Sequence, residues 1–468
     1  MERSLSTSAD NVRPDRQRTE SRALAIGLVL AVTTYAFDEL SIIAAMPKIV
    51  DDLGGVSLYG AAFSAFTLAM LLSLSVAGSI ADRHGPRPVL ATGLALFVVG
   101  LLIGGIAPSM PVLVLGRAVQ GLAGGTIGAT AYVVIGRAFP LERRAAMFAL
   151  LSGAWIVPAL VAPAAAGAIA EHVNWRLVFL GLLPFPILAA VLALPALHRL
   201  GAAAPELAGD GVVAQRARVA LRLVVGVAIA LVGLDRPEPV LALVLVGAGA
   251  AVGVPPLLRL LPRGTFRAMP VLPAIIATRL LVNWAFFGAD AFIPLALTSV
   301  RGTSALYAAL ALTAGGLSWS TAAWVQSRIT ARVNDGVLMA GGALGVGIGI
   351  AVVATTLWTA VPTGVAFLGW AIAGAGMGFT FNTASVAALR EAPAGEEGTT
   401  SSSLQLADAL GVSLSTGLGG AMVAAGDRSG WDPAPTLAVV FVITGAAVIP
   451  CVLAARRLRT TAADPVRV

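Results

Sequence analysis

Charged side chains are scarce in this sequence of 468 residues. Aspartate, glutamate, lysine and arginine together make up 12% of the chain, whereas hydrophobic residues make up 57%. Soluble domains contain about 25% charged residues, so this composition excludes an ordinary aqueous fold and predicts a protein that has lipid as its solvent. Cysteine is nearly absent as well: the single Cys451 excludes a disulfide framework and a cysteine-based metal site.

Histidine and lysine are also rare, and a common nucleotide-binding motif is absent. The three histidines, at positions 84, 172 and 198, are far apart, and Lys48 is the only lysine among 31 basic residues. The G-x-x-x-x-G-K-[ST] pattern of ATP sites does not occur. The net charge of +7 does not indicate a nucleic-acid partner, because the arginines gather in loops on one side of the predicted membrane. We expect no metal, no cofactor and no nucleic acid, and an ion gradient as the energy source.

Apolar stretches recur throughout the chain at the length that a helix needs to cross a bilayer, about 20 residues. Short turn signals rich in proline and glycine separate them. We therefore predict an all-α membrane protein with about fourteen crossings. The predicted spans are 24–47, 57–80, 88–108, 111–136, 145–170, 177–197, 217–234, 239–260, 270–298, 304–325, 337–357, 363–389, 401–424 and 434–455.

The basic residues separate by side when fourteen spans are assumed. Twenty-four of them lie in the loops and tails on the side of both termini, and five lie on the other side. Cytoplasmic loops of membrane proteins carry an excess of lysine and arginine. We therefore predict a multi-pass protein of a bacterial plasma membrane, with both termini in the cytoplasm.

The chain repeats itself at an offset of about 253 residues. Asp82 returns as Asp335, the segment 115–121 returns as 368–374, and Asp38 returns one residue out of step as Asp290. Internal repeats of this kind are typical of transporters. We predict two pseudo-symmetric six-helix bundles, at 22–200 and 268–457, and an inserted helix pair without a counterpart. The pair lies in a linker at 201–267, and cytoplasmic tails occupy 1–21 and 458–468.

The predicted loop after the second span carries a dense motif. Residues 78–90 read G-S-I-A-D-R-H-G-P-R-P-V-L, and this resembles the signature loop G-x-L-A-D-R-x-G-R-K-x-x-L of the major facilitator superfamily. An aspartate at a helix end beside arginines can clamp a neighbouring helix terminus, and such a clamp can part in another state. We assign these residues to a conformational gate: Gly78, Asp82, Arg83, Gly85 and Arg87.

Three further segments resemble the same superfamily. Residues 117–121 resemble its R-x-x-Q-G segment, and Asp38, Ala45 and Pro47 match part of a span-1 pattern of the fourteen-helix drug/proton antiporters. Leu40 and Ile43 replace a threonine and an asparagine of that pattern. In span 5, Gly153, Pro163 and Gly167 resemble the antiporter signature G-x8-G-P-x2-G-G, with alanines at 162 and 166. Because proline bends a helix and small residues allow close packing, the gate also includes Gly153, Pro158, Pro163 and Gly167.

Ionisable residues at membrane depth are functional candidates, because burying each costs about 2.5–3.5 kcal/mol on insertion scales. Desolvation favours the neutral form of a carboxylate, which suits a proton carrier. We predict Asp38, Glu39 and Asp290 as proton-coupling residues. The alternative for each of these three acids is a structural ion pair with Arg117 or Arg279. Arg279 could also reach the cytoplasmic interface, and Asp408 could belong to an inner vestibule.

The remaining candidates are polar and aromatic residues in the predicted spans. Aromatic faces accept apolar and cationic ligands without demanding one shape. The predicted substrate-binding set is Tyr35, Asp38, Arg117, Gln120, Trp155, Trp284, Asp290, Trp319, Asn382 and Gln405. Other aromatic residues considered for the pocket are Phe287 and Phe381.

The resemblance implies alternating access between two bundles around a central cavity. We predict a monomeric proton-coupled antiporter that exports amphipathic, cationic small molecules, as in multidrug efflux. The alternatives are export of a lipid or an endogenous metabolite, and a receptor or scaffold without transport. An enzyme is disfavoured, because the sequence shows no constellation of nucleophile and base.

Overall fold

A computed structural model describes residues 14–140, 143, 147, 150–151, 153–199, 210–234, 236–329, 332–392 and 397–460. In this part of the chain all regular structure is helical. Thirteen helical stretches are long and apolar enough to cross a membrane. Helix α13 (Ala305–Ile329), which carries several polar side chains, lies among them as a further crossing. The prediction of an all-α membrane protein with about fourteen crossings is confirmed.

The N-terminal half contains seven described α-helices. They are α1 (Pro14–Leu53), α2 (Tyr59–His84), α3 (Pro86–Gly105), α4 (Met110–Ala138), α6 (Ile156–Ile169), α7 (Arg176–Leu180) and α8 (Pro184–Ala193). Two short 3-10 helices, η1 (Val56–Leu58) and η3 (Ala196–Arg199), and a π-helical segment, η2 (Ala170–Asn174), lie between or after them. Helix α1 begins inside the stretch predicted as a tail, and its 40 residues make it longer than a bilayer requires.

The inserted pair consists of α9 (Asp210–Leu234) and α10 (Pro239–Leu260). The C-terminal half follows with α11 (Leu272–Asp290), α12 (Ile293–Leu295), α13, α14 (Asp335–Thr355), α15 (Val365–Arg390), α16 (Glu397–Arg428), α17 (Pro433–Ala446) and α18 (Val448–Arg456). Its shorter helical segments are the 3-10 helices η5 (Thr265–Arg267) and η7 (Arg457–Thr460) and the π-helical η6 (Ala296–Val300).

Among the predicted spans that the structure describes throughout, three are interrupted. The sixth span divides into α7 and α8, the ninth into α11, α12 and η6, and the last into α17 and α18. Each contains proline at or near the break, at Pro184, Pro294 and Pro450. Proline lacks a backbone N–H and clashes with the preceding turn, so the helical hydrogen-bond pattern stops or shifts there.

The sequence repeat is visible in the packing. A Cβ at Gly121 would lie 2.0 Å from the carbonyl oxygen of Phe66, and a Cβ at Gly374 would lie 2.1 Å from that of Gly315. Gly121 and Gly374 are 253 residues apart, so α4 meets α2 as α15 meets α13. Only glycine allows backbones to approach this closely. The prediction of two pseudo-symmetric bundles plus two inserted helices is confirmed.

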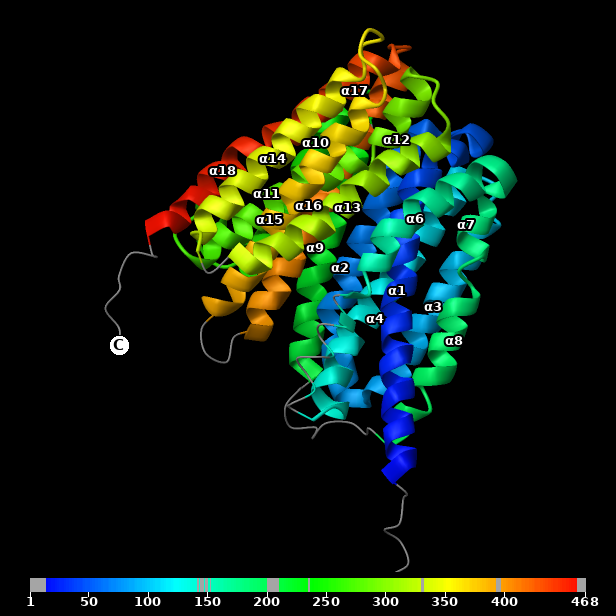
Figure 1. Ribbon diagram of the computed structural model, residues 1–468, viewed down its shortest axis with the longest axis vertical. Coiled ribbons are helices and arrows are strands. Elements are labelled where there is room, and N and C mark those ends of the chain that lie inside the picture. Colours follow the sequence, from blue (N-terminus) through cyan, green and yellow to red (C-terminus); the bar gives the residue numbers. More distant parts are fainter. Residues whose placement is uncertain are drawn as a thin grey trace, which may run out of the picture.

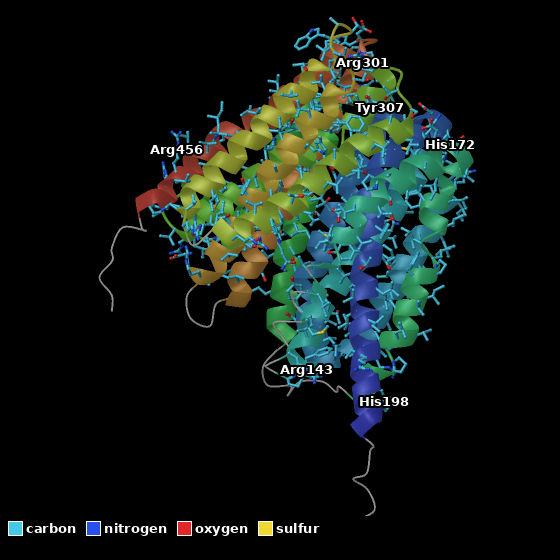
Figure 2. All side chains as sticks on the ribbon, viewed as in Figure 1. Arg143, His172, His198, Arg301, Tyr307 and Arg456 are labelled. Atoms are coloured by element: carbon cyan, nitrogen blue, oxygen red, sulfur yellow. The ribbon has the colours of Figure 1, made fainter. Side chains whose placement is uncertain are left out.

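The two halves lie side by side at one end of the molecule and diverge toward the other (Figure 1). We call the end at which α1 begins the terminal face, and the opposite end the distal face. Arg143 and His198 lie at the terminal face, whereas His172, Arg301 and Tyr307 lie at the distal face (Figure 2). Contacts between the halves join α2 to α16 and α6 to α13.

The inserted helices pack beside the bundles at the periphery. Gly226 of α9 approaches Gly253 of α10 so closely that a Cβ on Gly226 would lie 2.4 Å from the Gly253 nitrogen. Helix α9 also contacts α2 and α16, one from each half. The outward face of α10 is apolar, with Val240 76% and Leu243 75% exposed. Such a face suits lipid rather than water.

Candidate functional site

The N-terminal half buries a polar network between α1 and α4. Arg117 Nη1 lies 2.5 Å from Asp38 Oδ2 and 3.0 Å from Gln120 Oε1, and Gln120 Nε2 lies 2.9 Å from Asp38 Oδ1. All three side chains are at most 2% exposed. The guanidinium also stacks over the Phe66 ring at 4.3 Å. The predicted alternative of an ion pair between Asp38 and Arg117 is thus what the structure contains.

Glu39 is placed differently from its neighbour Asp38. It is half-buried, and no hydrogen bond or ion pair to it occurs in the described part of the chain. Its charge interacts with those of Arg117 and Asp38 and with Tyr35, whose ring meets that of Trp155 edge-on at 5.2 Å. The structure therefore brings Tyr35, Glu39 and Trp155 together beside the Asp38 network. An unpaired carboxylate next to aromatic faces is suited to an organic cation.

In the C-terminal half, the corresponding aspartate, Asp290, has different partners. Asp290 is 6% exposed, and its polar partner is the indole of Trp370. No ion pair to Asp290 occurs among the residues that the structure describes. Tyr59 from the other half lies near this carboxyl group, and its hydroxyl donates to the carbonyl oxygen of Ala291 at 2.8 Å. Asp290 is thus next to a contact between the halves.

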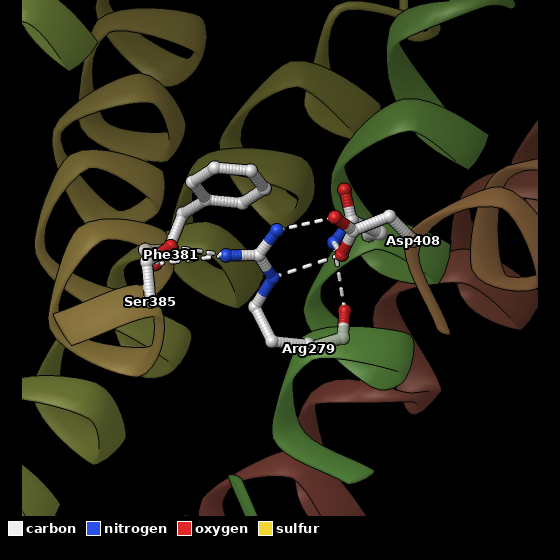
Figure 3. Close-up of polar contacts among 5 residues, drawn as sticks. Arg279, Phe381, Ser385 and Asp408 are labelled. Carbon is white, nitrogen blue, oxygen red and sulfur yellow. Dashed lines mark hydrogen bonds and ion pairs between the residues drawn. The ribbon is translucent and has the colours of Figure 1, made fainter. Parts of the chain in front are cut away.

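Arg279 joins three helices of the C-terminal half (Figure 3). Its Nε donates to Asp408 Oδ1 at 2.8 Å, and its Nη2 donates to the other oxygen of the same carboxylate. Its Nη1 donates to Ser385 Oγ at 2.5 Å and to the Phe381 carbonyl at 3.2 Å. Asn283 Nδ2 completes the network with a bond to Asp408 at 2.8 Å. Arg279 is therefore paired inside the bundle and does not reach an interface.

Aromatic rings connect the two polar centres of the C-terminal half. The rings of Phe286 and Trp370 stack at 4.6 Å, and Phe286 meets Trp319 edge-on at 5.4 Å. Trp319 in turn meets Phe381, whose ring lies under the Arg279 guanidinium. Trp319, predicted for the substrate site, is therefore part of a continuous aromatic wall. The other predicted residues, Trp284, Asn382 and Gln405, are half-buried and join neither network.

The segment 78–90, predicted as a loop, is mostly helical: α2 continues to His84 and α3 begins at Pro86, so the turn between them is Gly85. Gly85 has φ +86°, a conformation that L side chains rarely adopt, so glycine is required there. Gly78 is half-buried, and Arg83 and Arg87 are exposed at this turn. The side chain of Asp82 lies outside the described part of the structure. In the other repeat, Asp335 pairs with Arg390, whose Nη2 lies 2.6 Å from Asp335 Oδ2.

The antiporter-like segment of α6 packs against α13 of the opposite half. A Cβ on Gly167 would lie 2.6 Å from that of Ala309. Pro158 and Pro163 are buried in α6, whereas a Cβ on Gly153 would meet nothing within 4 Å. Of the predicted glycines in this segment, Gly167 allows the close approach and Gly153 does not take part in it.

Further contacts close the distal face. Tyr59 stacks on Phe292 with ring centres 5.4 Å apart, and Ser64 Oγ lies 3.1 Å from the Ser413 carbonyl. Glu171 Oε2 accepts a hydrogen bond from the Leu306 backbone at 2.8 Å. A small polar cavity of about 210 Å³, which includes Lys48, Asp51 and Glu171 in its lining, remains at this junction. The halves thus meet at the distal face.

The sequence prediction missed several members of these networks. Asn283, Phe286, Trp370 and Phe66 belong to these networks but are not among the predicted site residues. One signal was present: Arg279 and Asn283 are four residues apart on one helix face, so both could contact a single acid. Another was that Trp370 takes the position of Arg117 in the repeat. Among the described residues, no group of histidine, cysteine and acidic side chains could hold a metal ion.

Residues 28–416 match the family model of the Major Facilitator Superfamily. The chain is 32% identical over 175 residues to the multidrug transporter protein MdtP of Bacillus subtilis (strain 168), which is 37% of this chain and 32% of that protein. It is 34% identical over 161 residues to the probable multidrug-efflux transporter Rv1634 of Mycobacterium tuberculosis, 34% of each chain. The matched segments thus span about a third of these relatives.

Two solved structures share the architecture over nearly their whole length. The POT family transporter PepTSo superposes with a TM-score of 0.67 at 18% identity, covering 94% of this chain and 98% of that one. The D-xylose-proton symporter superposes with a TM-score of 0.65 at 17% identity, covering 92% and 96%. At these identities the likeness concerns the fold alone.

Proposed function

This chain belongs to the major facilitator superfamily, and on that premise we propose that it exports amphipathic, cationic small molecules by proton-coupled antiport. The relatives named as multidrug and efflux transporters support export. The proposal places the protein in a bacterial plasma membrane as a monomer, with the terminal face in the cytoplasm. The observation that carries it is the unpaired Glu39 beside the Tyr35–Trp155 aromatic pair.

The substrate class follows from the chemistry around Glu39. A carboxylate without a hydrogen-bond partner attracts a cation, and the edges and faces of Tyr35 and Trp155 accept its apolar part. The site makes few directional demands, because aromatic contacts do not require one shape. This combination favours varied organic cations over one sugar or peptide, whose hydroxyl and amide groups need matched partners.

Proton coupling follows from competition at the same carboxylates. A cation that approaches Glu39 or Asp290 favours the charged form, whereas desolvation without a cation favours the protonated form. Proton and substrate then exclude one another, which is antiport by exchange. Asp38, held by Arg117 and Gln120, would enter this exchange when protonation releases Arg117.

Alternating access is supported by the arrangement of the halves. The distal contacts hold the transporter closed on that face, while the helices diverge toward the terminal face (Figure 1). Asp290 lies next to the distal contact of Tyr59 with Ala291. A change in its charge is therefore placed where it can bias distal opening.

The test is efflux of an organic cation and of an uncharged analogue from proteoliposomes with an imposed pH gradient. Asp38→Asn, Glu39→Gln and Asp290→Asn are compared with Asp52→Asn, an exposed acid near the distal face. We expect at least one of the first three to lose cation efflux by about tenfold or more, with a smaller loss for the neutral compound. Normal pumping by all three would overturn the proton assignment.

A further inference from the structure

The loop that joins α10 to α11 forms a pocket at one corner of the terminal face. The cavity has a volume of about 440 Å³. It lies at the junction of the inserted helix pair and the C-terminal half, away from the networks described above. Its lining includes Leu258, Leu261, Arg263, Phe266, Arg267 and Met269.

The loop itself carries only positive charge. Residues 258–271 contain Arg259, Arg263 and Arg267 and no acidic residue. All three arginines are exposed, and none of their side chains forms an ion pair within the described part of the chain. Arg456, at the end of α18, is a fourth exposed arginine (Figure 2), and its neighbour Arg457 donates to the carbonyls of this loop. Such a cluster attracts anions.

The pocket also presents apolar side chains. Phe266 is 59% exposed, Met269 50% and Leu258 56%. Helix α10, with 22 residues, is about 33 Å long, so its end reaches the boundary between hydrocarbon and headgroups. Exposed apolar side chains that would be costly in water are favourable at that depth. A ligand of this pocket therefore has both an anionic and an apolar part.

The backbone of the loop is held in a defined shape. Gly264, Ala268 and Val271 have positive φ values of 90°, 45° and 69°. Thr265 Oγ1 donates to the Pro262 carbonyl at 2.7 Å, and Arg457 Nη1 donates to the carbonyls of Arg267 and Ala268 at 2.5 and 3.0 Å. Unfavourable backbone conformations persist only where surrounding contacts impose them. The pocket is therefore a built feature.

We propose that this pocket binds the phosphate headgroup of an anionic phospholipid. Arg263 and Arg267 would hold the phosphate, since guanidinium groups match its geometry with paired donors. The acyl chains would lie on Phe266, Met269 and the exposed face of α10. Basic pockets between membrane helices bind lipid headgroups in this manner. The lipid would fasten the inserted pair to the C-terminal half, a role independent of what the protein transports.

The experiment measures retained lipid on the purified full-length protein. Native mass spectrometry in detergent follows binding of phosphatidylglycerol, with phosphatidylcholine and free glycerol phosphate as separate arms. Arg263→Gln/Arg267→Gln removes two charges from the pocket. Arg22→Gln/Arg332→Gln removes two exposed charges elsewhere on the terminal face and is the matched control. Gly264→Ala keeps every charge but places a Cβ 2.3 Å from Met269 Sδ.

We expect one tightly held phosphatidylglycerol, with affinity lowered about 25-fold in the pocket double variant and little changed in the control. Gly264→Ala should also weaken binding, because it distorts the pocket without changing the charge. Equal losses in both double variants would overturn the proposal in favour of diffuse attraction. So would equal binding of phosphatidylcholine, or binding of glycerol phosphate as tight as that of the lipid.

Discussion

Arg117 and Trp370 occupy equivalent places in the two repeats, 253 residues apart, and each is the polar partner of an aspartate on the first helix of its half. Arg117 gives Asp38 an ion pair, whereas Trp370 gives Asp290 only an indole N–H. Two carboxylates that the repeat makes equivalent are therefore electrostatically different. The charge of Asp38 is compensated by an arginine, whereas the charge of Asp290 has no ion pair in the described structure.

Removing the guanidinium of Arg117 should destabilise the protein. Arg117→Met leaves Asp38 buried without its cation, and breaking a buried pair in this way costs about 3 kcal/mol or more. Unfolding in detergent, followed by heat or denaturant, measures the loss. The control is Arg176→Gln, which breaks the exposed pair with Asp52 and should cost less than about 1 kcal/mol. Equal losses in the two variants would show that the buried pair contributes no more to stability than the exposed one.

The two aspartates should respond oppositely to neutralisation. Asp38→Asn leaves Arg117 without a counter-charge and should lower the unfolding midpoint. Asp290→Asn removes a buried charge that has no ion pair in the described structure, so the midpoint should hold or rise. Both variants are compared in the same detergent. A similar drop for both would mean that Asp290 has a cationic partner in solution.

Closure of the distal face should depend on Gly60. A Cβ on Gly60 would lie 2.4 Å from the Thr416 carbonyl and 2.5 Å from the Gly420 Cα. Gly60→Ala should therefore hold the distal face open and slow transport. A cysteine introduced at Ser64, with Cys451 buried as background, reports opening by its reaction with a membrane-impermeant thiol reagent. Gly128→Ala, where a Cβ meets nothing within 4 Å, is the control and should leave the labelling rate unchanged.

Arg279 should not be replaceable by lysine. Its guanidinium contacts Asp408, Ser385 and the Phe381 carbonyl at once, and an ammonium group cannot reproduce this fork. Arg279→Lys should lower the free energy of unfolding by about 2 kcal/mol. The comparison is Arg328→Lys, an exposed arginine stacked on Trp324. If Arg279→Lys is as stable as Arg328→Lys, the network does not tie the helices together.

Both termini should lie in the cytoplasm. The reason is the separation of 24 basic residues on the side of the termini from five on the other. A reporter fused to the C-terminus should be active inside the cell, and one inserted between α9 and α10 should report the outside. Identical locations for the two reporters would contradict the topology.

The composition and pattern of the sequence determined the membrane fold. Apolar stretches of bilayer length have one stable form in lipid, so crossings follow from local composition. The repeat predicted the equivalence of Gly121 and Gly374, which the packing bears out because each backbone must approach its neighbour closely. The positions of the helix breaks could not be predicted from proline alone. Helix α6 continues through Pro163, whereas the helix before Pro294 ends at Asp290.

Only the tertiary structure decided how each buried charge is satisfied. Asp38 meets Arg117 across 79 positions of sequence, and Arg279 meets Asp408 across 129, so no local pattern specifies either pair. The adjacent residues Asp38 and Glu39 look alike in the sequence. They differ in the fold because successive side chains on a helix point about 100° apart. One therefore faces Arg117 on α4, and the other is left without a hydrogen bond beside Tyr35 and Trp155.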